Sequence, residues 1–258
     1  MTIDASTALM NHLLAALPDD EFQRWLPLLE PVELTQNRVL YEVGQTPSYA
    51  YFPTTAMVAL VIPLENCAST EVALVGNDGV VGVSVFMGGG CAPDCAVVLS
   101  AGLGLRLSAA ALNEAFNRNR KVTREMLGYT QALIAQMSQT IVCNRHHSLF
   151  ERLCRFILLS LDRLQSNELV MTQELIAQIL GVRRKGVTNA ALKLQAAGLI
   201  RYFRGRIKVI DRPGLARQSC ECYAVVRNEY ERLMPDLMLG SSAVNRRPRH
   251  ACLVSAQC

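Results

Sequence analysis

The chain lacks any long hydrophobic run. None reaches the roughly 18 apolar residues that a membrane-spanning helix needs, and the nearest approaches are residues 56–63 and 79–87. The first residues, MTIDASTALMNHLL, also lack the positive start and the small-residue cleavage site of a signal peptide. We therefore expect a soluble cytoplasmic protein without a membrane partner.

Metal-binding and catalytic motifs are missing as well. The nine cysteines are irregularly spaced and form no pair of Cys-x-x-Cys motifs, so we expect no metal site and assign no cofactor. The sequence contains no G-x-S-x-G, no H-E-x-x-H and no P-loop, and it has only four histidines. These absences argue against an enzyme.

What the sequence does have is a strong asymmetry of charge. The formal net charge is only +4, but residues 1–63 carry seven acids against two bases, whereas residues 183–212 carry nine bases against one acid. A block of one sign often marks no more than a solvated face. Here the basic block coincides with a helical motif, which indicates a polyanionic partner.

The chain has 258 residues, a length that is sufficient for two domains. The pattern of apolar residues changes along it. A helical pattern in residues 1–30 gives way, from about Glu33 to Leu112, to short β-rich runs separated by Gly, Pro, Asn and Asp, as in a sandwich or barrel. From Ala109 the period is helical again. One long amphipathic helix is predicted, and its position favours a dimer seam over an ordinary core helix; its apolar face contains Met126, Tyr129, Leu133, Met137 and Ile141.

The most informative stretch follows a further helix predicted over residues 145–168. Thr172 is a suitable N-cap for a short helix over residues 173–180, and a tight turn follows at Gly181. A second helix is expected over residues 183–197, ending at Gly198. Residues 199–203, a turn at 204–205 and residues 206–210 then predict a hairpin. This order of elements is typical of a winged helix-turn-helix.

The second helix has one apolar face, which we expect to be buried and which contains Val187, Ala190, Ala191 and Leu194. Its opposite face and its N-terminal turn can then enter the major groove of DNA. Arg184 is the candidate for a bidentate contact with guanine, and Asn189 can pair with adenine. We expect the remaining DNA-binding residues to be Arg183, Lys185 and Thr188 on the helix, with Lys193, Arg204 and Arg206 holding phosphate. We hypothesise that Gly186 lets the backbone approach DNA closely.

This order of parts resembles the Crp/Fnr superfamily of bacterial transcription regulators over roughly residues 20–220. The resemblance is carried by TQELIAQILGVRRKGVTNAALKLQAAGLIRYFRGRIKVIDRPGL, and also by CNRHHSLFERLCRFIL and CECYAVVRNEY. It implies an α+β chain with an N-terminal cyclic-nucleotide-binding-like β jelly roll, a long dimerisation helix and a C-terminal winged helix-turn-helix. Such a chain acts as a homodimer on a palindromic operator in double-stranded DNA, and we expect RNA polymerase as a further partner.

The resemblance divides the chain into a sensor domain (1–118), a dimerisation helix (119–144) and a DNA-binding domain (145–234). The composition of residues 235–258 predicts a disordered tail. Members that bind cyclic AMP carry a Gly-Glu pair and then an arginine that holds the cyclic phosphate. In GNDGVVGVSVFMGGGCAPDCAVV, Val83 stands where the glutamate would be, and Asp94 or Cys95 where the arginine would be. We therefore expect no response to cyclic AMP.

The recognition helix departs from the family too. Many members have an Arg-Glu-Thr-Val run, whereas this chain has Arg-Lys-Gly-Val at residues 184–187. Because lysine cannot accept a hydrogen bond from a base, the operator preference of those members is not carried over.

Other sensing chemistry and another partner remain open. Cys91 and Cys95 lie on a glycine-rich loop and could form a redox pair, and Cys220 and Cys222 could bind a thiophilic metal. His146 and His147 would point in different directions on a helix, so joint ligation is not expected. The alternative function is a redox- or ligand-sensing scaffold module whose basic domain binds a protein partner rather than DNA.

Overall fold

In the computed structural model, which describes residues 4–65 and 69–234, the N-terminal helical pattern divides into three short helices. They are α1 (Ala5–Leu9), α2 (His12–Ala15) and α3 (Asp19–Trp25), followed by the 3₁₀ turn η1 (Leu26–Leu28). Asn11 caps α2, because its side-chain oxygen accepts a hydrogen bond from Leu14 N at 3.1 Å. Its amide nitrogen donates to Pro53 O and Gly79 O, which fixes these helices to the strands that follow. The predicted tail over residues 235–258 lies outside the described residues.

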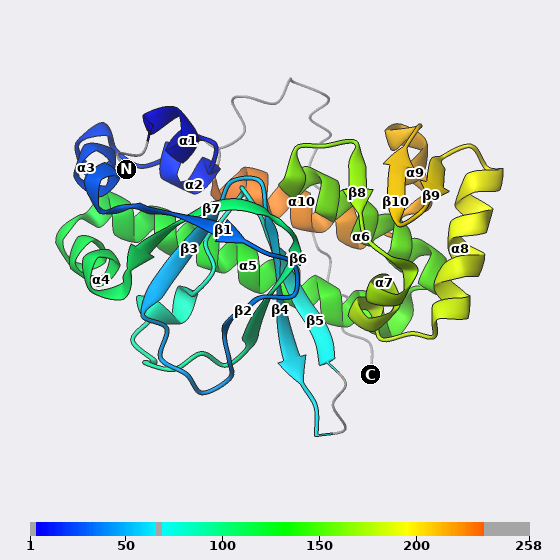
Figure 1. The fold of residues 1–258 in the computed structure, drawn as a ribbon, viewed down its shortest axis with the longest axis horizontal. Coiled ribbons are helices and arrows are strands. Elements are labelled where there is room, and N and C mark those ends of the chain that lie inside the picture. Colours follow the sequence, from blue (N-terminus) through cyan, green and yellow to red (C-terminus); the bar gives the residue numbers. More distant parts are fainter. Residues whose placement is uncertain (1–3, 66–68, 235–258) are drawn as a thin grey trace, which may run out of the picture.

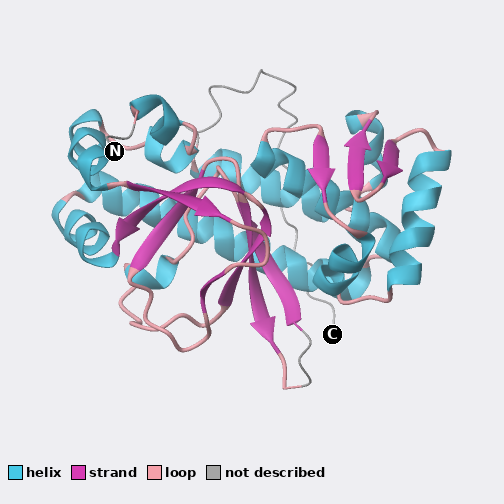
Figure 2. Ribbon diagram, in the orientation of Figure 1, coloured by secondary structure: helices cyan, strands magenta, loops and turns pink. Residues whose placement is uncertain are grey.

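The β-rich region forms two antiparallel sheets, as predicted for a jelly roll. The strands are β1 (Glu30–Leu34), β2 (Val39–Tyr41), β3 (Tyr49–Pro53), β4 (Met57–Pro63), β5 (Ser69–Val75), β6 (Cys95–Ser100) and β7 (Gly102–Ser108), with the 3₁₀ turn η2 (Val83–Val85) between β5 and β6. One sheet has the order β1-β7-β3 and the other β2-β6-β4-β5. Residues 57–60 of β4 are buried without alternation, because helices cover the outer face of this sheet. Figures 1 and 2 show the longest helix, over residues 120–146, crossing behind the strands.

Two helices follow the last strand: α4 (Ala109–Arg118) and the 27-residue α5 (Arg120–His146). Asn119 separates them, since it has extended backbone angles and its side chain accepts a hydrogen bond from Lys121 N at 2.9 Å. The long predicted helix is thus confirmed. Of the predicted apolar face, Met126, Tyr129 and Leu133 are buried within their own chain, whereas Ile141 is exposed; the dimer seam itself stays a prediction.

A different face of α5 is apolar and uncovered. Leu127, Ile134 and Ile141 recur at seven-residue intervals, and their exposed fractions are 48%, 53% and 69%. We call these three residues the α5 stripe. Seven-residue spacing of exposed apolar side chains is the pattern by which two helices pack along each other. Most of the predicted apolar face packs within the chain itself, and only Ile141 is shared with the α5 stripe.

The C-terminal part consists of helices around a small sheet. Its elements are α6 (Leu149–Leu164), β8 (Glu168–Val170), α7 (Gln173–Leu180), α8 (Arg184–Ala196), β9 (Ile200–Phe203), β10 (Arg206–Val209), α9 (Arg212–Gln218) and α10 (Glu221–Leu233). The sheet has the order β8-β10-β9. Helix α10 returns to pack along α5, and α8 lies at the edge of the molecule farthest from the sandwich (Figure 1). Among the described residues, no helix is both long and apolar enough to span a membrane.

One buried arginine joins the sandwich to this C-terminal part. Arg163, at the end of α6, is 2% exposed; its Nε donates to Leu74 O at 2.9 Å, and its Nη2 lies 3.2 Å from the Asp78 carboxylate. The guanidinium also lies over the ring of Tyr230 in α10, at 5.4 Å from the centroid. A buried guanidinium with this many partners fixes α6, and with it the helices that follow, on the sheet.

Candidate DNA-binding surface

The helix-turn-helix is built from α7 and α8, with boundaries close to those predicted. Thr172 caps α7, its hydroxyl oxygen accepting a hydrogen bond from Leu175 N at 3.2 Å. Gly181 ends α7 with a φ of +64°, and Gly198 follows α8 with a φ of +71°. Both glycines take the left-handed conformation that ends a helix at little cost for a residue without a Cβ.

One face of α8 is buried, as the sequence predicts. Val187, Ala190, Ala191 and Leu194 are all at most 5% exposed. The residues predicted to contact DNA therefore lie on the other side, and Arg183, Arg184, Lys185, Asn189 and Lys193 are exposed. Three of these are consecutive bases at the N-terminal end of the helix. There the free N–H groups and the positive end of the helix dipole add to their attraction for phosphate.

Thr188 differs from the rest of this set. It is half-buried, and its Oγ1 lies 2.6 Å from Gln173 Oε1 and 3.1 Å from Arg184 O. Because a hydroxyl has one hydrogen to donate, these two acceptors already occupy it. The side chain therefore helps to join α7 to α8, a contact that single-sequence periodicity could not reveal.

Arg184 is held only loosely. Its Nε lies 3.9 Å from Glu174 Oε2, and both side chains are largely exposed. An exposed ion pair of this length contributes little to stability, so the guanidinium is available to another acceptor at small cost.

The wing is the hairpin of β9 and β10. Arg204 and Gly205 form its two-residue turn with φ values of 47° and 76°, the mirror-image turn that fits the twist of paired strands. Arg206, on the next strand, pairs with Glu168 Oε1 at 2.8 Å on the surface. The two wing arginines of the predicted set are thus exposed and carried on a rigid hairpin.

Phe203 is a surface feature of the wing that sequence reasoning missed. Its side chain is 62% exposed, and the guanidinium carbon of Arg204 lies 5.0 Å from its ring centroid. A cation over an aromatic face is attracted by the ring quadrupole. An aromatic residue directly before a predicted hairpin turn was the signal that could have found it.

Gly186 does not have the hypothesised role. A Cβ at this position would stand 2.7 Å from Leu149 Cδ2, at the start of α6. The glycine therefore faces the interior of its own domain, and close approach to DNA is not what requires it.

The loop that would hold a cyclic phosphate lies far along the chain from this surface and has no base in residues 76–98. Asp94 is buried, and burial raises the pKa of its carboxyl. The side chain of Tyr41 donates a hydrogen bond to this carboxyl, which lowers the pKa by a smaller amount. Val83 lies in the 3₁₀ turn η2. Of the two cysteines considered as a redox pair, Cys91 is exposed and Cys95 half-buried at the start of β6. No group in this loop supplies the positive charge that a phosphate needs.

Comparison with known proteins supports the order of parts. Residues 151–218 match the model of the Crp-like helix-turn-helix domain. The chain has no significant match among curated proteins. Its fold is similar to that of FixK2 from Bradyrhizobium japonicum, with a TM-score of 0.66 and 17% identity over 74% of this chain and 98% of that one.

Two further solved structures are similar. A putative Crp/Fnr-family transcriptional regulator from Eubacterium rectale aligns with a TM-score of 0.59 and 16% identity, over 80% of this chain and 96% of that one. A Crp/Fnr-family transcriptional regulator from Thermus thermophilus aligns with a TM-score of 0.58 and 22% identity, over 74% of this chain and 98% of that one. At these identities the likeness is one of fold.

Proposed function

We propose that this chain is a Crp/Fnr-type transcription regulator that binds a specific sequence in double-stranded DNA through α8 and its wing. The proposal is supported by the match of residues 151–218 to the Crp-like helix-turn-helix domain and by the fold that the chain shares with FixK2. The observation that carries the proposal is the pairing of a fully buried apolar face of α8 with an exposed, basic N-terminal turn. A helix held in this way can enter the major groove while its domain stays folded.

Individual roles follow from side-chain chemistry. Arg184 makes a bidentate contact with the O6 and N7 acceptors of a guanine, a contact worth about 1–3 kcal/mol of discrimination against the wrong base. Asn189, which is exposed one turn further along, pairs with adenine. Thr188 orders the helix and reaches DNA only if its bond to Gln173 is exchanged. The phosphate contacts come from Arg183, Lys185, Lys193, Arg204 and Arg206, which position the domain without specifying sequence.

We further propose that two chains act as a homodimer through the α5 stripe. Leu127, Ile134 and Ile141 are exposed on the longest helix, at intervals of seven residues. In a monomer these three apolar side chains would remain in contact with water. A two-fold dimer carries two recognition helices, so its operator is a palindrome with half-sites one helical turn apart. In this assembly residues 1–118 are the sensor domain and residues 145–234 the DNA-binding domain, with RNA polymerase as the further partner in the cytoplasm.

Cyclic AMP is not the signal under this proposal. The loop over residues 76–98 has no base to pair with a cyclic phosphate.

The proposal is tested by fluorescence anisotropy with a duplex selected from a random pool and with a scrambled duplex of the same composition. Arg184→Ala should weaken binding to the selected duplex and leave binding to the scrambled one nearly unchanged. Arg206→Ala should weaken both and lower the slope of log affinity against log salt by about one. Arg38→Ala, an exposed arginine of the sandwich, is the matched control and should change neither.

The alternative is that the basic domain binds a protein. Two results together would overturn the proposal and favour that alternative. The parent chain would bind the selected and the scrambled duplex equally weakly, and neither Arg184→Ala nor Arg206→Ala would change that affinity.

A further inference from the structure

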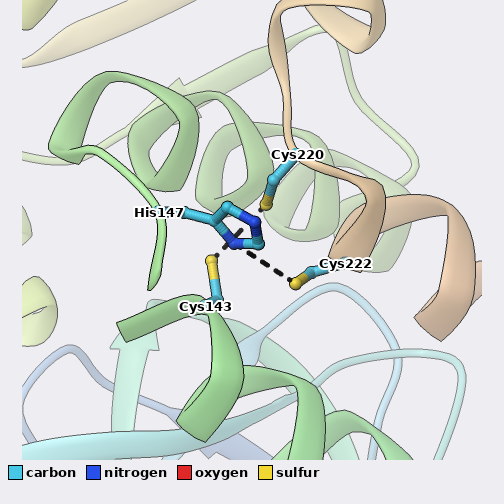
Figure 3. Close-up of side chains that lie close together, drawn as sticks. All are labelled: Cys143, His147, Cys220 and Cys222. Atoms are coloured by element: carbon cyan, nitrogen blue, oxygen red, sulfur yellow. Dashed lines mark hydrogen bonds between the residues drawn. The ribbon is translucent and has the colours of Figure 1, made fainter. Parts of the chain in front are cut away.

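Four potential metal ligands meet where the end of α5 lies beside the start of α10. They are Cys143, near the end of α5, His147, which follows α5, and Cys220 and Cys222 at the start of α10. Their ligand atoms all lie within 4.8 Å of one another (Figure 3). Cys143 Sγ lies 3.5 Å from Cys220 Sγ, and Cys222 Sγ lies 3.5 Å from His147 Nδ1. No metal site was predicted from the sequence beyond the possibility of a thiophilic metal at Cys220 and Cys222, because the four residues form two short pairs that are far apart in the chain.

Two helix ends bring the four residues together. Cys143 and His147 are one helical turn apart, and His147 N donates to Cys143 O at 3.1 Å, which closes the last turn of α5. Cys220 occupies the N-cap of the 13-residue α10, and Cys222 lies in its first turn. The positive end of the α10 dipole therefore lies beside the sulfur atoms, where it attracts negative charge such as that of a metal–thiolate group.

The spacing fits one tetrahedral ion. With zinc–sulfur bonds of about 2.3 Å and zinc–nitrogen bonds of about 2.0–2.1 Å, the edges of a Cys₃His tetrahedron are roughly 3.5–3.8 Å long. The separations of 3.5 Å for one sulfur pair and for one sulfur–nitrogen pair are close to those edges. Four atoms enclosed this closely hold a single ion and leave no room for a cluster of iron and sulfide. Four protein ligands also leave no open position, as in structural rather than catalytic sites.

The surroundings orient the histidine. His147 Nε2 lies 3.3 Å from Glu221 Oε1 on the surface, so the ring donates its proton there and its Nδ1 lone pair faces Cys222. A carboxylate on the far nitrogen is the arrangement by which proteins fix a metal-binding imidazole in one tautomer.

The charge balance favours an occupied site. Three thiolates and a divalent ion carry a net charge of −1, and Arg155, which is 5% exposed, interacts electrostatically with Cys143 and Cys222. The Nε atoms of Arg152 and Arg155 are buried without a hydrogen-bond partner in the described part of the chain. Buried cations of this kind are stabilised by a nearby anion. The buried carboxylate of Glu71 already compensates part of the charge of both arginines, and a metal–thiolate group of charge −1 would add to that compensation.

We propose that Cys143, His147, Cys220 and Cys222 bind one Zn²⁺ ion, with the three thiol protons released to water as the ion enters. The ion links the end of α5 to the start of α10 and thereby closes the Crp-like helix-turn-helix domain at its base. A shallow surface hollow lined by Ser219, Cys220 and Glu221 gives the ion a path from solvent. This inference goes beyond DNA binding and does not depend on it.

Elemental analysis of the full chain, purified under reducing conditions without chelator, tests the proposal. We expect about one zinc per chain. After replacement of zinc by Co²⁺, we expect the intense visible bands of a tetrahedral ion and a thiolate-to-cobalt band in the near ultraviolet. Cys220→Ser with Cys222→Ser should lower the bound metal at least tenfold, whereas the control Cys154→Ser, which changes a buried cysteine of α6 outside the set, should keep the parent stoichiometry.

Several results would overturn the proposal, and the first three need no variant. The first is a chain that is purified without metal and, when Co²⁺ is added, gives only the weak spectrum of octahedral Co²⁺. The second is a brown protein that contains iron and sulfide. The third is a Cys143–Cys220 disulfide in protein from reducing cells. Full zinc content in the folded double variant would do so as well. Because each readout concerns the metal alone, failure here would leave the DNA-binding proposal standing, and failure of DNA binding would leave the zinc site standing.

Discussion

Gly186, in the first turn of the recognition helix, packs against Leu149 at the start of α6. A methyl group added to Gly186 would stand 2.7 Å from Leu149 Cδ2, the far end of a flexible side chain. The glycine is therefore a packing residue between the first helix of the DNA-binding domain and its recognition helix.

Gly186→Ala should change stability and DNA affinity only slightly, because a gain in helix propensity and a cost in side-chain packing oppose each other. Alanine gains about 1 kcal/mol of helix propensity over glycine, and displacement of the Leu149 side chain offsets part of it. We expect the free energy of unfolding in urea to change by less than about 1 kcal/mol, and the affinity for the selected duplex to stay within twofold. A tenfold loss of affinity at unchanged stability would instead restore the hypothesis that DNA approaches the backbone there.

The α5 stripe gives a prediction about assembly. Ile134→Glu places a charge at its centre, and burying an unpaired charge between two helices is strongly unfavourable. We expect the variant to sediment as a monomer at concentrations where the parent is a dimer. Leu103→Glu is the control, since Leu103 is 54% exposed on the sandwich and away from α5. A dimer that survives Ile134→Glu together with Ile141→Glu would place the interface elsewhere.

The buried Arg163 predicts a large stability effect. Arg163→Met should lower the free energy of unfolding by about 3–5 kcal/mol, because it leaves the Asp78 carboxylate and Leu74 O without their partner. Arg106→Met removes a surface pair with Glu30 at 2.6 Å and should cost about 1 kcal/mol or less. Urea unfolding of both variants measures the difference. Equal, small losses would mean that Arg163 does not hold the sandwich and the helices together.

Asp94 predicts a pH dependence of stability. Burial raises the pKa of its carboxyl in the folded chain above the unfolded value of about 3.9. The folded state then binds the proton more tightly, so stability falls as pH rises from about 4 through the folded pKa. Asp94→Asn cannot titrate, and its stability relative to the parent should rise across this window in urea titrations at successive pH values. If the free energy of unfolding of the parent rose relative to that of the variant as pH rises, this assignment would be contradicted.

Local patterns predicted much of the fold. The cap at Thr172, the left-handed glycines at 181 and 198 and the buried face of α8 all follow from nearest-neighbour chemistry, and all are confirmed. The fold class is confirmed as well, and residues 151–218 match the Crp-like helix-turn-helix domain. Strands β1 and β8 were not separately predicted, because their partners are remote in sequence and both strands are short.

Contacts between segments that are distant in the sequence could not be predicted. The apolar spacing of α5 identified a helix but could not say that Tyr129 faces its own chain while Ile134 faces solvent. In the same way, Cys143 and Cys220 are 77 residues apart in sequence and meet only because α10 folds back along α5. Periodicity describes one helix at a time, whereas a seam or a ligand set requires knowing which helix lies next to it.

Selection from a pool of randomised duplexes by the purified full chain tests the central claim most directly. The account predicts enrichment of a palindrome whose half-sites are about 10–10.5 base pairs apart from centre to centre, or a multiple of that spacing. It also predicts that Arg184→Ala loses the preference for the guanine of each half-site. A pool that shows no enriched sequence after repeated rounds would contradict the assignment of α8 as a sequence-specific recognition helix.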